Sequence, residues 1–158
     1  MHTPTLPERD HHQFQRRVIA AFRANGGRVG GRFAGTSLVL LTTVGARTGL
    51  RRTNPLAYVE VGGHPVVVAR GLGGGRLPAW YHNIRANPAV TVEIGAEIHD
   101  AVARIAADSE RDGLIARIID LAPDFREFLA DPNRTVPVVI LHRVPRQRRA
   151  ERTGSACG

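Results

Sequence analysis

The stretch that decides the fold is LVLLTTVGARTGLRRTNPL, residues 38–56. Four apolar residues run into two threonines, which predicts a buried strand over residues 37–43. Gly45 and Gly49 then bracket a tight polar loop, and Pro55 opens the next extended run. The pattern predicts two strands joined by a short loop.

Three arginines, Arg47, Arg51 and Arg52, are expected to crowd into this loop. Guanidinium groups so close together repel one another and gain nothing from a hydrophobic core. Their planar forks match phosphate or carboxylate oxygens, and glycines leave backbone N–H groups within reach of the same anion. The loop is therefore a candidate anion site, and an ordinary solvated hairpin loop is the alternative.

Composition narrows the class of protein. With 158 residues, 42% of them hydrophobic, the chain can form one domain with a substantial core. It has no apolar run long enough to span a membrane, no apolar amino-terminal stretch of signal-peptide type, and a single cysteine, Cys157. We therefore expect a cytoplasmic protein without internal disulfides. The absence of lysine excludes lysine nucleophiles and Schiff bases.

The net charge of +8 has two interpretations: a nucleic-acid binder, or a binder of a small polyanion that also carries a basic tail. Five arginines lie near the carboxyl terminus, at positions 143, 146, 148, 149 and 152. We therefore expect a single domain over residues 1–145 and a disordered basic tail over residues 146–158.

Hydrophobic periodicity and turn residues predict the order of elements. The expected helices cover residues 8–25, 78–86, 108–121 (capped by Asp108 or Ser109) and 124–129. The expected strands cover residues 37–43, 54–60, 65–70, 89–94, 97–105 and 136–142, with a glycine loop over residues 71–75. Short turns between strands favour an antiparallel sheet, so we expect an α+β fold with a six-stranded barrel and flanking helices. The seven scattered histidines predict no metal site.

Four segments in this order resemble the deazaflavin (F420)-dependent nitroreductase family of actinobacterial type: TTVGARTGLRRTNPL (42–56), PAWYHNI (78–84), ANPAVTVEIG (86–95) and RTVPVVIL (134–141). The resemblance covers about residues 14–144. It implies a split β-barrel, similar to the FMN-binding barrels, and coenzyme F420, an 8-hydroxy-5-deazaflavin with an anionic side chain. By this resemblance Arg47 and Arg52 grip the coenzyme phosphate, while Ala46 and Thr48 supply backbone or hydroxyl donors.

The resemblance also implies further coenzyme contacts: Thr53, Asn54, Pro55, Ala69, Arg70, Gly71, Leu72, Ala79, Trp80, Tyr81, His82 and Asn83. For Trp80 a plain core position is the alternative. An apolar substrate pocket is expected at Tyr58, Phe125 and Phe128, although the two phenylalanines equally suit a core. Ala46 and Leu72 stand where many members place basic residues. Phe125 replaces a tyrosine implicated in nitroimidazole reduction, so that activity is not expected here.

The implied function is hydride transfer from reduced coenzyme F420 to an apolar acceptor such as a quinone, an enone or a nitroaromatic. No catalytic residue is assigned, and the product proton is left to solvent, Tyr58, Tyr81 or His82. The alternatives are an FMN-dependent reductase on the same barrel, a non-enzymatic coenzyme carrier, and a basic nucleic-acid-binding module. The expected partner is a small redox acceptor and no specific nucleic acid. A peripheral membrane contact through the amino-terminal helix stays open, as does the choice between monomer and homodimer.

Overall fold

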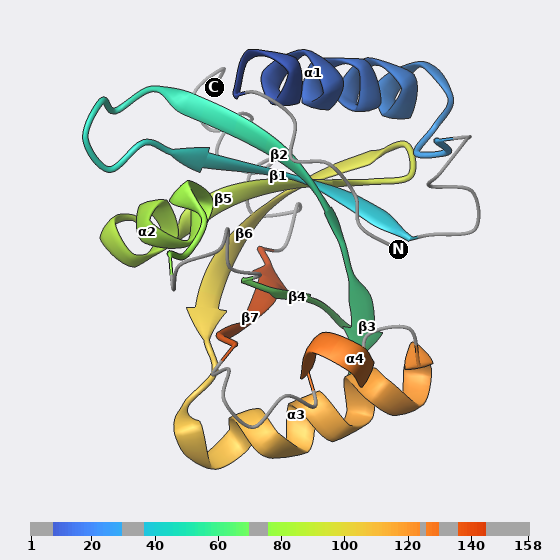
Figure 1. Cartoon of the computed structure of the whole chain (residues 1–158), viewed down its shortest axis with the longest axis vertical. Coiled ribbons are helices and arrows are strands. Elements are labelled where there is room, and N and C mark those ends of the chain that lie inside the picture. Colours follow the sequence, from blue (N-terminus) through green and yellow to red (C-terminus); the bar gives the residue numbers. More distant parts are fainter. Residues whose placement is uncertain (1–7, 30–36, 70–75, 124–125, 130–135, 145–158) are drawn as a thin grey trace, which may run out of the picture.

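The computed structural model describes residues 8–29, 37–69, 76–123, 126–129 and 136–144, with only the backbone at residues 8–12, 127 and 128. Its strands form one curled antiparallel sheet in the order β2-β1-β5-β6-β7-β4-β3 (Figure 1). The strands are β1 (Leu38–Val44), β2 (Arg51–Ala57), β3 (Val59–Val61), β4 (His64–Val68), β5 (Ala89–Ile94), β6 (Glu97–Ile105) and β7 (Val138–Arg143). The helices are α1 (Glu8–Ala24), α2 (Ala79–Ala86), α3 (Asp108–Leu121) and α4 (Arg126–Leu129).

The two edge strands, β2 and β3, are consecutive in the chain and separated only by Tyr58. The backbone N–H of Tyr58 donates to the carbonyl oxygen of Ser37 at 3.1 Å. One extended run, predicted as a single strand over residues 54–60, thus pairs first with β1 and then with β4. The described residues accordingly hold seven strands where six were predicted. The predicted antiparallel split barrel with flanking helices is confirmed.

The core lies on the inner face of the curled sheet. Val39 and Leu41 of β1 pack there with Val67, Val92 and Leu141 from other strands, and α2 adds Trp80, Tyr81 and Ile84. Side chains alternate between the two faces of a strand, so the neighbouring Leu38 and Leu40 lie on the outer face. There α1 covers them, which explains the uninterrupted apolar run at the start of β1.

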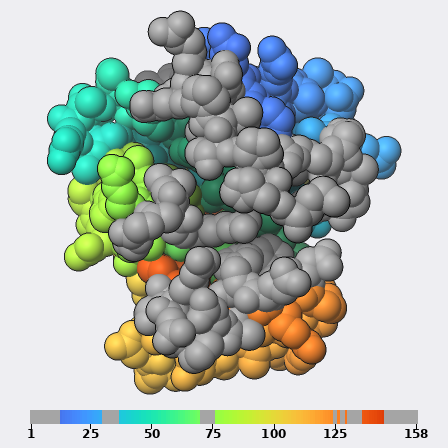
Figure 2. Space-filling model, in the orientation of Figure 1, coloured from blue at the N-terminus to red at the C-terminus, as the bar shows by residue number. Residues whose placement is uncertain are grey.

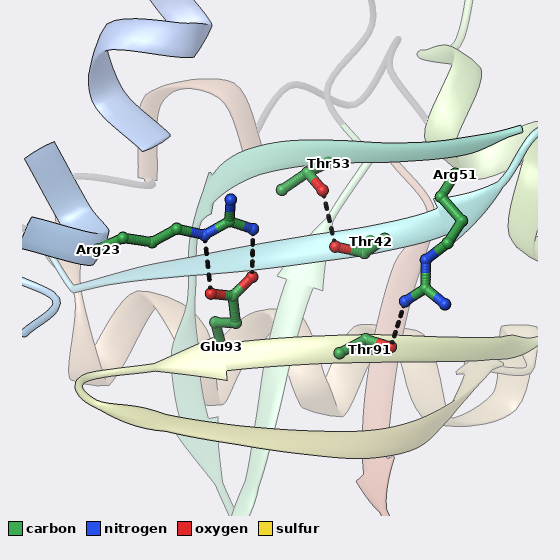
Figure 3. Close-up of polar contacts among 6 residues, drawn as sticks. All are labelled: Arg23, Thr42, Arg51, Thr53, Thr91 and Glu93. Atoms are coloured by element: carbon green, nitrogen blue, oxygen red, sulfur yellow. Dashed lines mark hydrogen bonds and ion pairs between the residues drawn. The ribbon is translucent and has the colours of Figure 1, made fainter. Parts of the chain in front are cut away.

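Helix α1 is fixed to the outer face at two places. Val18 and Phe22 pack against the leucines of β1. At the end of the helix, Arg23 Nε and Nη2 donate to the two carboxylate oxygens of Glu93 on β5, at 3.0 and 2.8 Å (Figure 3). Glu93 is buried, so this paired contact compensates for removing its carboxylate from water.

Helices α3 and α4 cover the outer face at the other end of the sheet (Figure 1). The predicted buried face of α3 is confirmed: Ile118 is buried, and Leu114, Ile115 and Ile119 pack against the same cluster. The predicted cap at Asp108 or Ser109 is wrong, because Ala107 occupies the N-cap position. Its N–H donates at 2.9 Å to the Glu110 carboxylate, which replaces a capping side chain.

Some predictions fall on residues that the structure does not describe: the glycine loop over residues 71–75, the first two residues of the helix predicted over residues 124–129, and the tail over residues 146–158. None of the helices in the described residues combines the length and hydropathy needed to cross a membrane.

Candidate functional site

The candidate site is built on the hairpin of β1 and β2. The two strands pair as far as Val44 and Arg51, so the connecting loop consists of residues 45–50. Of the three arginines only Arg47 lies in this loop, while Arg51 and Arg52 are the first residues of β2. The prediction that all three crowd into the loop is wrong, because the strand pairing extends further toward the loop than the sequence indicated.

Arg51 and Arg52 lie on opposite faces of the sheet. Arg51 is on the outer face, where its Nη2 donates to Thr91 Oγ1 at 3.0 Å and its strand neighbour Thr53 shares a hydrogen bond with Thr42 at 2.8 Å (Figure 3). Arg52 stands directly opposite Thr43, whose hydroxyl is bonded from α2 on the inner face. Strand geometry therefore separates a guanidinium on the α2 side from one on the α1 side.

The loop itself is closed by its own hydrogen bonds. The N–H of Gly45 donates to the Leu50 carbonyl at 2.7 Å, and the N–H of Gly49 donates to the Gly45 carbonyl at 2.9 Å. The N–H of Leu50 donates to Thr48 Oγ1 at 3.1 Å. Gly49 has φ +70°, a conformation that suits glycine. These contacts hold the loop in one conformation with Arg47 exposed upon it.

Two adjacent backbone donors remain in this loop. In the described part of the chain, the N–H groups of Arg47 and Thr48 have no acceptor. The Thr48 hydroxyl oxygen accepts from Leu50, which leaves its proton for donation. The loop therefore offers N–H donors, a hydroxyl and a guanidinium, all of which suit an anion.

Asn83 connects α2 to this hairpin. Its side chain is 7% exposed; its Oδ1 accepts from the N–H of Ala46 at 3.0 Å, and its Nδ2 donates to Thr43 Oγ1 at 3.0 Å. Figure 2 shows the loop end of the hairpin next to α2 on one flank of the molecule. The N–H of Ala46, predicted as a donor to the coenzyme, is therefore engaged within the chain.

The remaining predicted residues of α2 divide by burial. Trp80 is 4% exposed and belongs to the inner core, where Ala69 also lies and against which Tyr58 packs. Tyr81 contacts the edge of the Trp80 ring at a centroid distance of 6.5 Å. Ala79 and His82 are exposed. The fold thus brings Ala69, Trp80 and Tyr58, predicted for coenzyme and substrate, to one cluster.

The residues predicted to run along the coenzyme ring do not share a face. Asn54 pairs opposite Leu41 and lies on the inner face, whereas Thr53 and Pro55 lie on the outer face. Four other predicted residues, Arg70, Gly71, Leu72 and Phe125, lie outside the described residues, and Phe128 is described only as backbone of α4.

Tyr58 is a half-buried phenol at the crossing from β2 to β3. Burial raises its pKa, and the negative charge of Glu60 raises it further, while Arg143 acts in the opposite direction. The phenol therefore holds its proton more firmly than an ordinary tyrosine, and Tyr58 can donate a hydrogen bond at neutral pH.

Sequence reasoning missed Thr43, whose hydroxyl accepts a hydrogen bond from Asn83. It is a threonine inside a strand, where that residue is common for its branched side chain alone. The signal in the sequence was that Thr43 follows the apolar run and stands two residues before Gly45.

The chain is similar to known proteins over most of its length. Residues 14–143 match the family described as F420H(2)-dependent quinone reductase. An F420H(2)-dependent quinone reductase of Mycobacterium tuberculosis strain H37Rv is 32% identical over 130 residues, which cover 78% of this chain and 86% of that protein.

Solved structures give the same result. The structure of an F420-H2 dependent reductase, FDR-A, is 34% identical with a TM-score of 0.59, and the match covers 74% of this chain and 100% of that one. A structure described as a domain-swapped dimer is 31% identical with a TM-score of 0.60, covering 86% of this chain and 100% of that one. The resemblance predicted from the four sequence segments is confirmed: the chain belongs to the F420H(2)-dependent quinone reductase family.

Proposed function

We propose that this protein transfers a hydride from reduced coenzyme F420 to a quinone, with the hairpin loop of residues 45–50 as the coenzyme's anion site. The observation that supports this proposal most directly is that the structure brings three of the predicted segments into contact. Asn83 ties the loop carrying Arg47 and the strand pair carrying Arg52 to the helix that carries Trp80.

The donor set fits the coenzyme. A phosphodiester and carboxylates call for guanidinium groups and backbone N–H donors. The hairpin supplies Arg47, Arg52 and the two N–H groups of Arg47 and Thr48. When bound, the coenzyme supplies the hydride; the protein's part is to bind, orient and exclude water.

The inner cluster suits the flat ring of the coenzyme. Trp80 and Ala69 lie in it, and Tyr58 packs against it with its phenol protonated. We assign Tyr58 to the acceptor side, where its hydroxyl can hold the proton that a reduced quinone needs. Tyr81 is buried in the same cluster and is the second candidate for this role, whereas His82 is exposed and lies outside the cluster.

The alternatives fare differently. Family membership favours coenzyme F420 over FMN and an oxidoreductase over a carrier, and it names quinones among the candidate acceptors. Against a nucleic-acid-binding module, the guanidinium groups of Arg23 and Arg104 are engaged with the carboxylates of Glu93 and Glu110.

Replacing Arg47 of the loop together with Arg52 of the inner face tests the anion site. Hydrogen bonds to charged groups contribute about 1.5–3 kcal/mol each, so Arg47→Ala with Arg52→Ala should weaken coenzyme binding about 10²- to 10⁴-fold. Fluorescence titration with coenzyme F420 measures the affinity, and a soluble quinone measures turnover.

Arg51→Ala is the matched control. It removes one positive charge from the residue beside Arg52 in the same strand, but from the outer face, where Arg51 contacts Thr91. Its affinity should stay within about threefold of the native protein, the effect expected of long-range charge alone. Equal losses in both variants would contradict the assignment of the site to the inner face, and an unchanged double variant would refute the anion site.

A further inference from the structure

We infer that Asn83 is a positioning residue: its buried amide fixes the conformation of the hairpin loop and thereby sets the affinity for coenzyme F420, without contacting the coenzyme. This inference rests on the proposed function. It differs from the role that the family resemblance implies, in which Asn83 is itself a coenzyme contact.

The first observation is how the amide is used. Its oxygen is taken by the N–H of Ala46 and its nitrogen donates to Thr43, both at 3.0 Å. With 7% of the residue exposed, little of Asn83 is within reach of a ligand. Both ends of the amide therefore serve the protein.

The second observation is where the two partners lie. Ala46 immediately precedes Arg47, whose N–H and guanidinium are the proposed anion donors. Thr43 stands directly opposite Arg52 in the strand pair. One side chain thus holds the backbone next to Arg47 and contacts the hydroxyl of the residue opposite Arg52.

The third observation is that the loop has few other described hydrogen bonds to the rest of the protein. Its other described hydrogen bonds, among Gly45, Thr48, Gly49 and Leu50, are internal and would move with it as one piece. The contact of Ala46 with Asn83 is the described hydrogen bond that ties this piece to a helix. Without it the loop could swing about the end of the hairpin, and the coenzyme would have to order the loop on binding.

The test uses Asn83→Leu, which keeps the branched shape of the side chain and removes both hydrogen bonds. In the coenzyme-free protein, hydrogen exchange at the Ala46 amide should accelerate about tenfold or more, because that N–H loses its acceptor. The Gly49 amide, which is bonded to Gly45 within the loop, serves as the internal reference.

Coenzyme binding provides the second readout. The dissociation constant for coenzyme F420 should rise about tenfold, while kcat for a soluble quinone at saturating coenzyme should stay within about twofold of the native value. Asn87→Ala is the matched control: Asn87 ends the same helix, is exposed, and accepts from Ala89 rather than from the loop. It should leave both readouts at their native values.

Thr43→Val is the second variant, for the case in which Asn83→Leu does not fold. It removes the strand contact and retains the acceptor of the Ala46 N–H, so Ala46 exchange should change less than about threefold. Native exchange at Ala46 in Asn83→Leu, or native coenzyme affinity despite fast exchange, would overturn the inference. A fall in kcat with an unchanged dissociation constant would place Asn83 at the reacting ring instead. If the native protein does not bind coenzyme F420, the proposed function fails, and the exchange data alone decide whether Asn83 fixes the loop.

Discussion

At the scale of single residues, Gly45 shows how tightly the loop is built. A Cβ placed on Gly45 would lie 2.5 Å from Thr48 Oγ1 and 3.2 Å from the Leu50 carbonyl oxygen. The first of these distances is too short for any real contact, so the Thr48 hydroxyl would have to move. It would then lose the N–H of Leu50 that it now accepts. The reason for glycine here is space, since its φ is not positive.

We expect Gly45→Ala to lower stability by about 1 kcal/mol, which corresponds to about 2–4 °C in Tm for a chain of this size. Coenzyme affinity should fall as well, because the displaced hydroxyl lies beside the proposed anion donors. Thermal melts and fluorescence titration measure the two effects. Gly113→Ala is the control: it lies in α3 with open space around it, and alanine there should stabilise the helix by up to about 1 kcal/mol. A Gly45→Ala protein that behaves like the control would show that the loop has more room than its geometry indicates.

Most of the residues of the candidate site could be predicted from the sequence. The geometry in which the fold arranges them could not. The arginines, the glycines and the helix with Trp80 and Asn83 were all identified in the sequence. Which face each arginine occupies depends on where β2 begins, and a shift of one residue exchanges the faces. The sequence does not indicate the first residue of β2. Gly49 permits the turn, and neither Leu50 nor Arg51 has a clear preference for loop or strand.

At the scale of elements, a polar cluster joins three strands to α3. The ring of His142 in β7 packs at a tilt against that of His64 in β4, with a centroid distance of 4.6 Å. Arg104 of β6 donates to His142 Nε2 at 3.3 Å and also pairs with Glu110 of α3. Burial lowers the pKa of His142, and the charges of His64 and Arg104 lower it further, against the opposing effect of Glu110.

A lowered histidine pKa makes the folded protein bind fewer protons than the unfolded chain. Stability is therefore complete above the unfolded pKa of about 6.5 and falls as the pH drops through that value and below it. We expect His142→Gln to flatten this decline. Urea denaturation at pH 7.5 and at pH 5.5 measures it, with a smaller difference between the two midpoints in the variant than in the native protein. Parallel pH profiles would assign the acid sensitivity to other groups.

The elements themselves were largely predictable, because each of the long ones carries its own periodicity or turn signal. The errors arose where a contact between two elements determines where a helix or strand begins or ends. The run predicted as one strand became β2 and β3 because its two halves pair with different neighbours. The start of α3 depends on the Glu110 carboxylate, which satisfies the N–H of Ala107 in place of the predicted cap.

At the scale of the whole molecule, the family match and the last strand end together, at residue 143. A chain that stops after Val144 loses four arginines and one glutamate, which lowers its net charge from +8 to +5. We expect this truncation to leave Tm within about 1 °C and coenzyme affinity within about twofold of the native protein. Any binding to DNA at low salt should weaken, since such binding depends on total positive charge. A large loss of coenzyme affinity would instead place the removed segment at the site.

Among the described residues, the two edge strands of the curled sheet, β2 and β3, are connected through Tyr58. The chain therefore passes from one edge of the sheet to the other with one residue between the strands. Extra residues between β2 and β3 would let these edge strands separate, and the barrel would open. The same insertion at the exposed turn of Gly62 and Gly63 would only lengthen a hairpin. The connections that close the sheet therefore determine where this fold tolerates insertions during evolution. The exposure of a connection alone does not predict that tolerance.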